Sequence, residues 1–306
     1  MSKILFFSST QFGAEILKTL YESQNEIVGV VTRADKIRGR GNKVLSTPVK
    51  EFAAKNNINV FERDFIYKED ESWIRDLKAD FFVVVAYGAI LPQYILDIPA
   101  IAPINIHASL LPKYRGASPI ESAIKDGESK TGISYMKMVK SLDAGDVYKA
   151  YEINVDENEN FDSLNKRLCD LSKETIVDVL ARIESGELKP APQGPGETYV
   201  GKISKDDAQI DFNNNSIDVK NKINSLDSHI GAYAFNGDER YKLFSAITAD
   251  VKLDVGEIKI IDGRIYIGTK DSSVIINAIQ APGKKKMLVG DFLRGNNIEG
   301  KFEYKR

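Results

Sequence analysis

The chain has 306 residues, of which 42% are hydrophobic and 28% are charged, a balance typical of a globular protein with well-formed cores. Its formal net charge of −2 excludes a protein that binds nucleic acid over its whole surface, so any such contact must come from local basic patches. Two histidines and one cysteine are too few for a zinc site of nitrogen and sulfur ligands, and no metal is expected.

The single cysteine, Cys169, excludes an intramolecular disulfide and fits a reducing compartment. The apolar run at the start of the sequence is too short for a signal peptide, and it reads directly as a strand. No window of the sequence approaches the length of apolar chain that spans a membrane. We therefore expect a cytoplasmic protein that does not bind membranes.

Short apolar runs alternate with segments of helical periodicity through the first two-thirds of the chain. The predicted strands are residues 4–7, 27–32, 60–61 and 80–86, and the predicted helices are residues 13–22, 47–56 and 69–77. Strands that are apolar on both faces and separated by helices indicate a parallel sheet covered on both sides. The sequence thus predicts a doubly wound, mostly parallel α/β domain of Rossmann-like type over residues 1–188.

A second domain is predicted after a break in composition. Residues 188–197 contain three prolines and two glycines, which indicates a linker, taken as residues 189–203. The strands expected beyond it are short and separated by turn signals such as Asn236-Gly237 and Asp262-Gly263, and they lie at residues 240–246, 256–261, 264–268 and 274–279. With one helix at 217–225, they predict a small β-barrel of the oligonucleotide-binding (OB-like) type over residues 204–306.

Asn105 and His107 are the first candidates for chemistry. They lie two positions apart in a strand-like segment, so their side chains point to the same face. An amide donor beside an imidazole can stabilise an oxyanion that develops on a carbonyl carbon under attack. The same pair on a strand is also compatible with a purely structural role, and this reading stays open.

A second candidate is Asp143 in the sequence SLDAGD, residues 141–146. Carboxylates that flank a glycine often form turns or helix caps. In the functional reading, this acid orients the imidazole and accepts a proton from an attacking amine. A single sequence does not show whether the loop lies near His107.

The stretch NIHASLLPKYRGASPI, followed by LDAGD, resembles the 10-formyltetrahydrofolate-dependent formyltransferase family. The resemblance implies that Asn105, His107 and Asp143 form a catalytic trio. It also implies that folate binds along two segments, with Ser109 acting as a folate-loop hydroxyl rather than an acyl carrier. The implied folate-binding residues are Ser109, Leu110, Leu111 and Pro112 in one segment, and Tyr87, Ala89 and Leu91 in the other.

The resemblance extends almost end to end and is strongest to members whose acceptor is methionine on tRNA. The supporting segments are residues 33–43, 46–50, 83–92, 202–212 and 281–287. The implied reaction transfers the formyl group of 10-formyltetrahydrofolate, a co-substrate, to the α-amino group of methionyl-initiator-tRNA for translation initiation. The implied enzyme is a monomer that needs no metal and contacts the tRNA acceptor stem.

The segment from Arg33 to Lys43 contains five basic residues, one acid and two glycines. On its own, this composition predicts a solvated, mobile loop. The resemblance instead implies an insertion that clamps the tRNA acceptor end, with Arg40 as the foremost contact. The implied tRNA contacts are Arg33, Lys36, Arg38, Arg40 and Lys43, together with Lys284, Lys285 and Lys286 from the predicted barrel.

Other functions remain open from the sequence. A folate hydrolase or a sugar-nucleotide formyltransferase would share the trio. A nicotinamide-dependent dehydrogenase suits the α/β alternation, but residues 8–13 lack the G-x-G-x-x-G phosphate fingerprint. A non-catalytic RNA-binding module would bind tRNA without transferring a formyl group.

Overall fold

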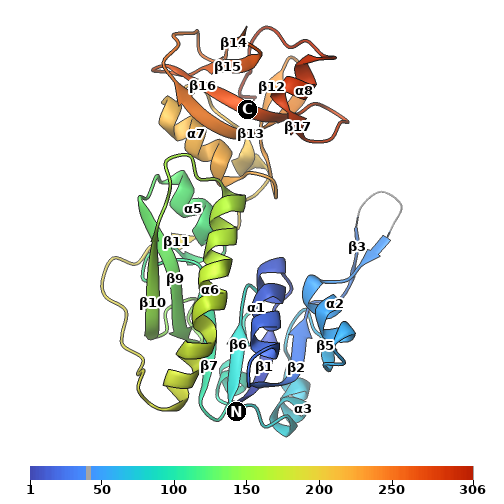
Figure 1. Ribbon diagram of the computed structural model, residues 1–306, viewed down its shortest axis with the longest axis vertical. Helices are drawn as coiled ribbons and strands as arrows, with labels where there is room; N and C mark the ends of the chain where they lie inside the picture. The colour runs from blue at the N-terminus through green and yellow to red at the C-terminus, as the bar shows by residue number, and fades with distance from the viewer. Residues whose placement is uncertain (39–42, 306) are drawn as a thin grey trace. The chain divides into compact units, whose positions relative to one another are not determined.

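The computed structural model describes residues 1–38 and 43–305, and the chain divides into two compact units (Figure 1). The first unit comprises Met1–Ala117, Gly132–Ile153 and Asn165–Tyr199, and the second comprises Ser118–Thr131, Asn154–Leu164 and Val200–Arg306. The predicted linker is therefore divided between them at Tyr199. Within the described ranges, no helix combines the length and the apolar character needed to cross a membrane.

The first unit is built on a seven-stranded sheet in the order β10-β9-β7-β6-β1-β2-β5. Its strands are β1 (Lys3–Phe7), β2 (Glu26–Thr32), β5 (Val60–Glu62), β6 (Phe81–Val84), β7 (Ala102–His107), β9 (Lys130–Lys137) and β10 (Val147–Asn154). The pairs β1–β2, β1–β6, β2–β5 and β6–β7 are parallel, whereas β7–β9 is antiparallel. The predicted mostly parallel sheet is confirmed.

Strand β1 shows why this sheet is covered on both faces. Leu5 and Phe7 belong to one buried cluster together with Ile74 of helix α3 (Glu71–Asp76). Ile4 and Phe6 point to the opposite face, because side chains alternate along a strand, and they are also fully buried. A continuous apolar run is therefore the sequence that this central position requires.

Helices cover the sheet at positions that local sequence signals specify. The side chain of Thr10 caps helix α1 (Gln11–Tyr21), and that of Thr47 caps α2 (Pro48–Lys55), where Pro48 occupies the first turn. The remaining helical elements of this part are the 3-10 turn η1 (Lys68–Asp70), α4 (Gln93–Leu96) and the long α6 (Phe161–Glu184). Helix α6 lies beside α1, with Lys173 Nζ 3.9 Å from Glu15 Oε2.

The basic segment that follows β2 forms a hairpin in the structure. Strand β3 (Lys36–Arg38) pairs antiparallel with β4 (Lys43–Leu45), and Ile37 lies opposite Val44. Within the segment from Arg33 to Lys43, residues 36–38 and Lys43 are therefore paired in strands rather than part of a loop, whereas residues 39–42 lie outside the described ranges.

The second unit contains an antiparallel sheet in the order β12-β13-β16-β15-β14, with β17 paired to β16. Its strands are β12 (Ala232–Asn236), β13 (Glu239–Ala249), β14 (Ile258–Ile261), β15 (Arg264–Gly268), β16 (Ser273–Gln280) and β17 (Met287–Leu288). Asp262 and Gly263 join β14 to β15 with φ of 50° and 71°, as a tight hairpin turn requires. The predicted β-rich domain is confirmed.

Four short helical elements complete this unit: α5 (Pro119–Lys125), the 3-10 turn η2 (Asp206–Ala208), α7 (Ser216–Ser225) and α8 (Val289–Leu293). Helix α7, predicted at 217–225, packs on β13 and on α5. Its Val219 and Ile223 enter the core of the sheet. Helix α5 was not predicted from the sequence, although Pro119 in its first turn is a helix-start signal.

Candidate active site

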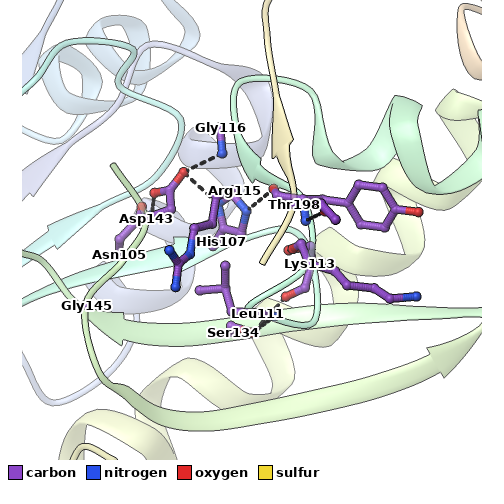
Figure 2. Close-up of polar contacts among 12 residues, drawn as sticks. Asn105, His107, Leu111, Lys113, Arg115, Gly116, Ser134, Asp143, Gly145 and Thr198 are labelled. Carbon is purple, nitrogen blue, oxygen red and sulfur yellow. Dashed lines mark hydrogen bonds and ion pairs between the residues drawn. The ribbon is translucent and has the colours of Figure 1, made fainter. Parts of the chain in front are cut away.

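The structure brings Asn105, His107 and Asp143 together in the first unit (Figure 2). Asn105 and His107 lie near the carboxyl end of β7, and the Asp143 carboxylate faces the side chains of both. Asn105 Nδ2 donates to Asp143 Oδ1 at 3.3 Å, and His107 Nδ1 lies 3.6 Å from Asp143 Oδ2. An amide, an imidazole and a carboxylate therefore meet at one edge of the sheet, where open α/β sheets commonly bind their ligands.

The loop that carries Asp143 is held in an uncommon conformation. Asp143 has a φ of 45°, in the left-handed region that non-glycine residues rarely adopt. Its Oδ2 accepts a hydrogen bond from the Gly116 backbone N–H at 2.8 Å. Gly145 allows a close approach to β9, because a Cβ at this position would lie 1.7 Å from the Lys137 carbonyl oxygen. The loop is thus fixed against the end of β9.

The hydrogen bonding of His107 determines which ring nitrogen carries a proton. His107 Nε2 lies 2.8 Å from the Tyr114 carbonyl oxygen, and this ring is 5% exposed. A carbonyl oxygen only accepts, so Nε2 must donate. Nδ1 is then the nitrogen that faces Asp143, and it can accept a proton or, when charged, form an ion pair with the carboxylate.

Residues 191–199 return to this site, although the sequence predicts them as part of a linker. Gln193 Nε2 donates to the backbone carbonyls of Asp143 and Gly145 at 2.9 and 2.7 Å. Thr198 accepts hydrogen bonds from the backbone N–H groups of Tyr114, at 2.8 Å, and Arg115, at 2.9 Å. This contact lies where β8 (Arg115–Gly116) pairs with β11 (Tyr199–Val200). Neither Gln193 nor Thr198 was predicted as a site residue from the sequence.

The first predicted folate segment is partly buried. Leu110, Leu111 and Pro112 are neither fully buried nor fully exposed, so each retains apolar surface for a ligand. Ser109 is fully buried, and its hydroxyl donates to the Lys113 carbonyl at 2.6 Å. The Ser109 hydroxyl therefore stabilises the loop from within.

The second predicted folate segment lies mainly in the core. Tyr87 is 2% exposed and Leu91 is 1% exposed, and Ala89 packs against the same cluster. The Tyr87 hydroxyl donates to the Arg63 carbonyl at 2.6 Å, and burial raises the pKa of Tyr87 to about 12. The side chains of Tyr87 and Leu91 are thus occupied by packing, which leaves backbone atoms as the means of contacting a ligand.

The predicted tRNA contacts of the first unit fall on and around the β3–β4 hairpin. The guanidinium of Arg33 donates to the backbone carbonyls of Tyr87 and Gly88 and thereby joins the start of the hairpin to the loop after β6. Lys36, Arg38 and Lys43 lie in the paired strands. Arg40 lies outside the described residues.

The three consecutive lysines of the second unit differ in their surroundings. Lys286 Nζ forms an ion pair with Asp227 Oδ1 at 2.6 Å and lies over the Phe244 ring. Asp227 is 1% exposed, so this pair stabilises a buried carboxylate. Lys284 and Lys285 are exposed at the adjacent turn. The Lys286 ammonium group is thus already paired within the second unit.

Comparisons with known proteins agree with this architecture. The family model described as formyl transferase matches residues 2–180, and the model described as formyl transferase, C-terminal domain, matches residues 202–297.

Two curated relatives match almost the whole chain. The chain is 42% identical over 300 residues to methionyl-tRNA formyltransferase of Thermotoga maritima, covering 97% of this chain and 96% of the relative. It is 40% identical over 304 residues to the protein of the same name from a Sulfurihydrogenibium species, covering 97% and 98%. Among solved structures, HypX from Aquifex aeolicus in complex with tetrahydrofolic acid aligns with a TM-score of 0.68 at 18% identity, over 100% of this chain and 51% of that one.

Proposed function

This chain belongs to the formyl transferase family, and from that membership we propose that it transfers the formyl group of 10-formyltetrahydrofolate to the α-amino group of methionine on initiator tRNA. The acceptor is inferred from two relatives, each at least 40% identical over nearly the full length and named methionyl-tRNA formyltransferase. The donor is inferred from the family and from the structural neighbour solved with tetrahydrofolic acid. The product would serve translation initiation.

The catalytic part of the proposal rests on one observation: the side chains of Asn105, His107 and Asp143 lie together. Asn105 and Gly116 donate to the Asp143 carboxylate, and His107 Nδ1 faces it at 3.6 Å. Such a group accepts a proton from an attacking amine, directly or through water. Asp143 is therefore the proposed base.

Asn105 is the proposed oxyanion donor. One hydrogen of its Nδ2 is directed to Asp143, and the second remains for an acceptor at the site. When an amine attacks the formyl carbon, negative charge develops on the formyl oxygen, and a fixed amide donor stabilises it. Removing one such donor typically lowers turnover by about 10²–10³-fold.

His107 is the proposed proton carrier at the same place. Because its Nε2 donates to the Tyr114 carbonyl, any further proton resides on Nδ1, beside Asp143 and the proposed reaction centre. A proton taken from the amine can pass to Nδ1 and return to the departing folate nitrogen. The 3.6 Å gap is longer than a hydrogen bond, and such contacts commonly shorten when substrate binds.

Binding of the two substrates is proposed to involve different parts of the chain. Leu110, Leu111 and Pro112 lie three to five positions after His107 and provide apolar surface for the folate. Basic residues of the hairpin segment, including Arg40, and the exposed Lys284 and Lys285 provide phosphate contacts for the acceptor stem of the tRNA.

The test is to incubate the purified protein with methionylated initiator tRNA and 10-formyltetrahydrofolate and to measure formylmethionine after hydrolysis of the ester. His107→Ala serves as the catalytic control. Parallel reactions offer an amino-sugar nucleotide or water alone as the acceptor. Formylation of the sugar, or folate hydrolysis at the same rate with and without tRNA, would replace the proposed acceptor. tRNA binding that survives in His107→Ala, without formyl transfer by the unmodified protein, would indicate an RNA-binding module.

A further inference from the structure

The segment 191–199 contains one residue that is partly buried. Every residue from 191 to 199 is exposed except Gln193, which lies between Pro192 and Gly194. A polar side chain is withdrawn from water at low cost only when its donors and acceptors are satisfied. The contacts of Gln193 therefore indicate why the segment lies where it does.

The amide of Gln193 uses its full hydrogen-bonding capacity within the site. Its Nε2 donates to the Asp143 carbonyl at 2.9 Å and to the Gly145 carbonyl at 2.7 Å. Its Oε1 accepts from Arg115 Nε at 3.1 Å and from Arg115 Nη2 at 2.7 Å. An amide has two donors and two acceptor positions, so all four are satisfied.

These contacts connect the backbone of one segment beside the Asp143 carboxylate with the Arg115 side chain of another. One is the loop containing Asp143 and Gly145. The other contains Arg115 and continues to Gly116, whose N–H donates to Asp143 Oδ2 at 2.8 Å. Gln193 therefore fixes the carboxylate-bearing loop relative to one of the carboxylate's own hydrogen-bond donors.

The conformation of Asp143 explains why such a connection is needed. Its φ of 45° is unfavourable for an aspartate, and a residue of this kind keeps its conformation only when surrounding contacts hold it. On one side the loop is held by β9, where Lys137 N donates to the Asp146 carbonyl at 2.8 Å. On the other side, the two carbonyls that flank the turn are held by Gln193.

We propose that Gln193 is a positioning residue for catalysis: its amide fixes the Asp143 loop against the strand of Arg115 and Gly116 and thereby sets the rate of formyl transfer. This inference rests on the proposed function, because it assigns Asp143 as the base. Gln193 itself does not touch a reacting atom. Its effect is expected in kcat rather than in KM.

The first experiment compares Gln193→Ala, Gln193→Glu and Gly194→Ala in the formyl-transfer assay. Misplacing a catalytic group by about 1 Å costs on the order of 10²-fold, so we expect kcat of Gln193→Ala to fall about 10²-fold with KM for both substrates within about threefold. Gln193→Glu keeps the size of the side chain and its contact with Arg115, but it replaces the Nε2 donor by an oxygen that faces two carbonyls. Its kcat should fall at least as far as that of Gln193→Ala. Gly194→Ala is the matched control, because a Cβ at this position has no atom within 4 Å, and its activity should be unchanged.

A double-mutant cycle separates positioning from general destabilisation. If Gln193 acts through Asp143, Gln193→Ala should lower the residual kcat of an Asp143→Asn variant by less than about threefold, since coupled residues are not additive. A merely structural role would give the full loss again in that background. Circular dichroism and thermal unfolding monitor the fold, and the similarly sized Gln193→Glu supplies the test if the alanine variant does not fold.

The outcomes distinguish this inference from the proposed function. Formyl transfer by the unmodified protein together with kcat of a folded Gln193→Ala or Gln193→Glu within threefold of it would overturn the role of Gln193 alone. A loss that appears in KM, or that is additive with Asp143→Asn, would also overturn it. Absence of formyl transfer by both the unmodified protein and Gly194→Ala would instead refute the proposed function.

Discussion

Replacing Asn105 by alanine tests the proposed chemistry most directly. The change removes the amide that donates to Asp143 Oδ1 and the second hydrogen that is proposed to stabilise the oxyanion. It leaves in place the Gly116 N–H bond to Asp143 and the His107 bond to the Tyr114 carbonyl. The rest of the site is therefore expected to keep its geometry.

The structure sets the size of both effects. The bond from Asn105 to Asp143 is 3.3 Å long and partly buried, at the weak end of the range, so its loss should lower the free energy of unfolding by at most about 1 kcal/mol. For a domain of this size, that corresponds to a Tm lower by about 2–4 °C. The loss of a preorganised oxyanion donor should lower kcat by about 10²–10³-fold, or about 2.7–4 kcal/mol of transition-state stabilisation.

The assay is formylmethionyl-tRNA formation under saturating substrates, with Tm measured on the same preparation. Asn105→Asp is the companion variant, because it keeps the shape but places a carboxylate beside that of Asp143, and it should be at least as impaired. Turnover of Asn105→Ala within about threefold of the unmodified protein, at an unchanged Tm, would refute the oxyanion role of the amide.

The remaining predictions concern stability. Gly145→Ala should lower the free energy of unfolding by about 1–3 kcal/mol and also abolish most turnover, because its Cβ would lie 1.7 Å from the Lys137 carbonyl oxygen. Thermal unfolding and the formyl-transfer assay measure the two effects. An unchanged Tm would contradict this prediction. Burial raises the pKa of Tyr87 to about 12, above the value of about 10 in the unfolded chain, so the unfolded state binds fewer protons between these values and stability falls as the pH rises from 10 to 12. Urea unfolding at pH 9 and pH 11.5 should show a smaller fall for Tyr87→Phe, and equal falls would refute the assignment. Lys286→Ala should lower the free energy of unfolding by about 1–3 kcal/mol, because it removes the cation paired with buried Asp227. A Lys286→Ala variant that loses tRNA affinity without losing stability would contradict this prediction.

The sheet of the first unit was predictable because its central strands carry a strong local signal. Residues 4–7 and 81–86 are continuous apolar runs, which are typical of strands buried on both faces. Strand β10 was not predicted. It lies at the sheet edge and is largely exposed, so its alternating pattern is weak and resembles that of a loop.

The candidate site was only partly predictable for a different reason. Asn105 and His107 share a strand, so their common face follows from a spacing of two residues. The contact of Asp143 with them depends on a loop 36 positions after His107, and only the family resemblance suggested it. Gln193 gave no local signal at all, since a glutamine between a proline and a glycine reads as linker, and its partners lie about 50 and 80 residues away.

The position of residues 191–199 has a consequence for the order in which the site matures. A nascent chain that has left the ribosome only as far as residue 188 already carries the amide, the imidazole and the carboxylate. It still lacks the glutamine and the threonine that tie the surrounding loops together. The same holds for a recombinant fragment that ends at residue 188. Full activity in acyl transfer should therefore arise only once Tyr199 has left the ribosome.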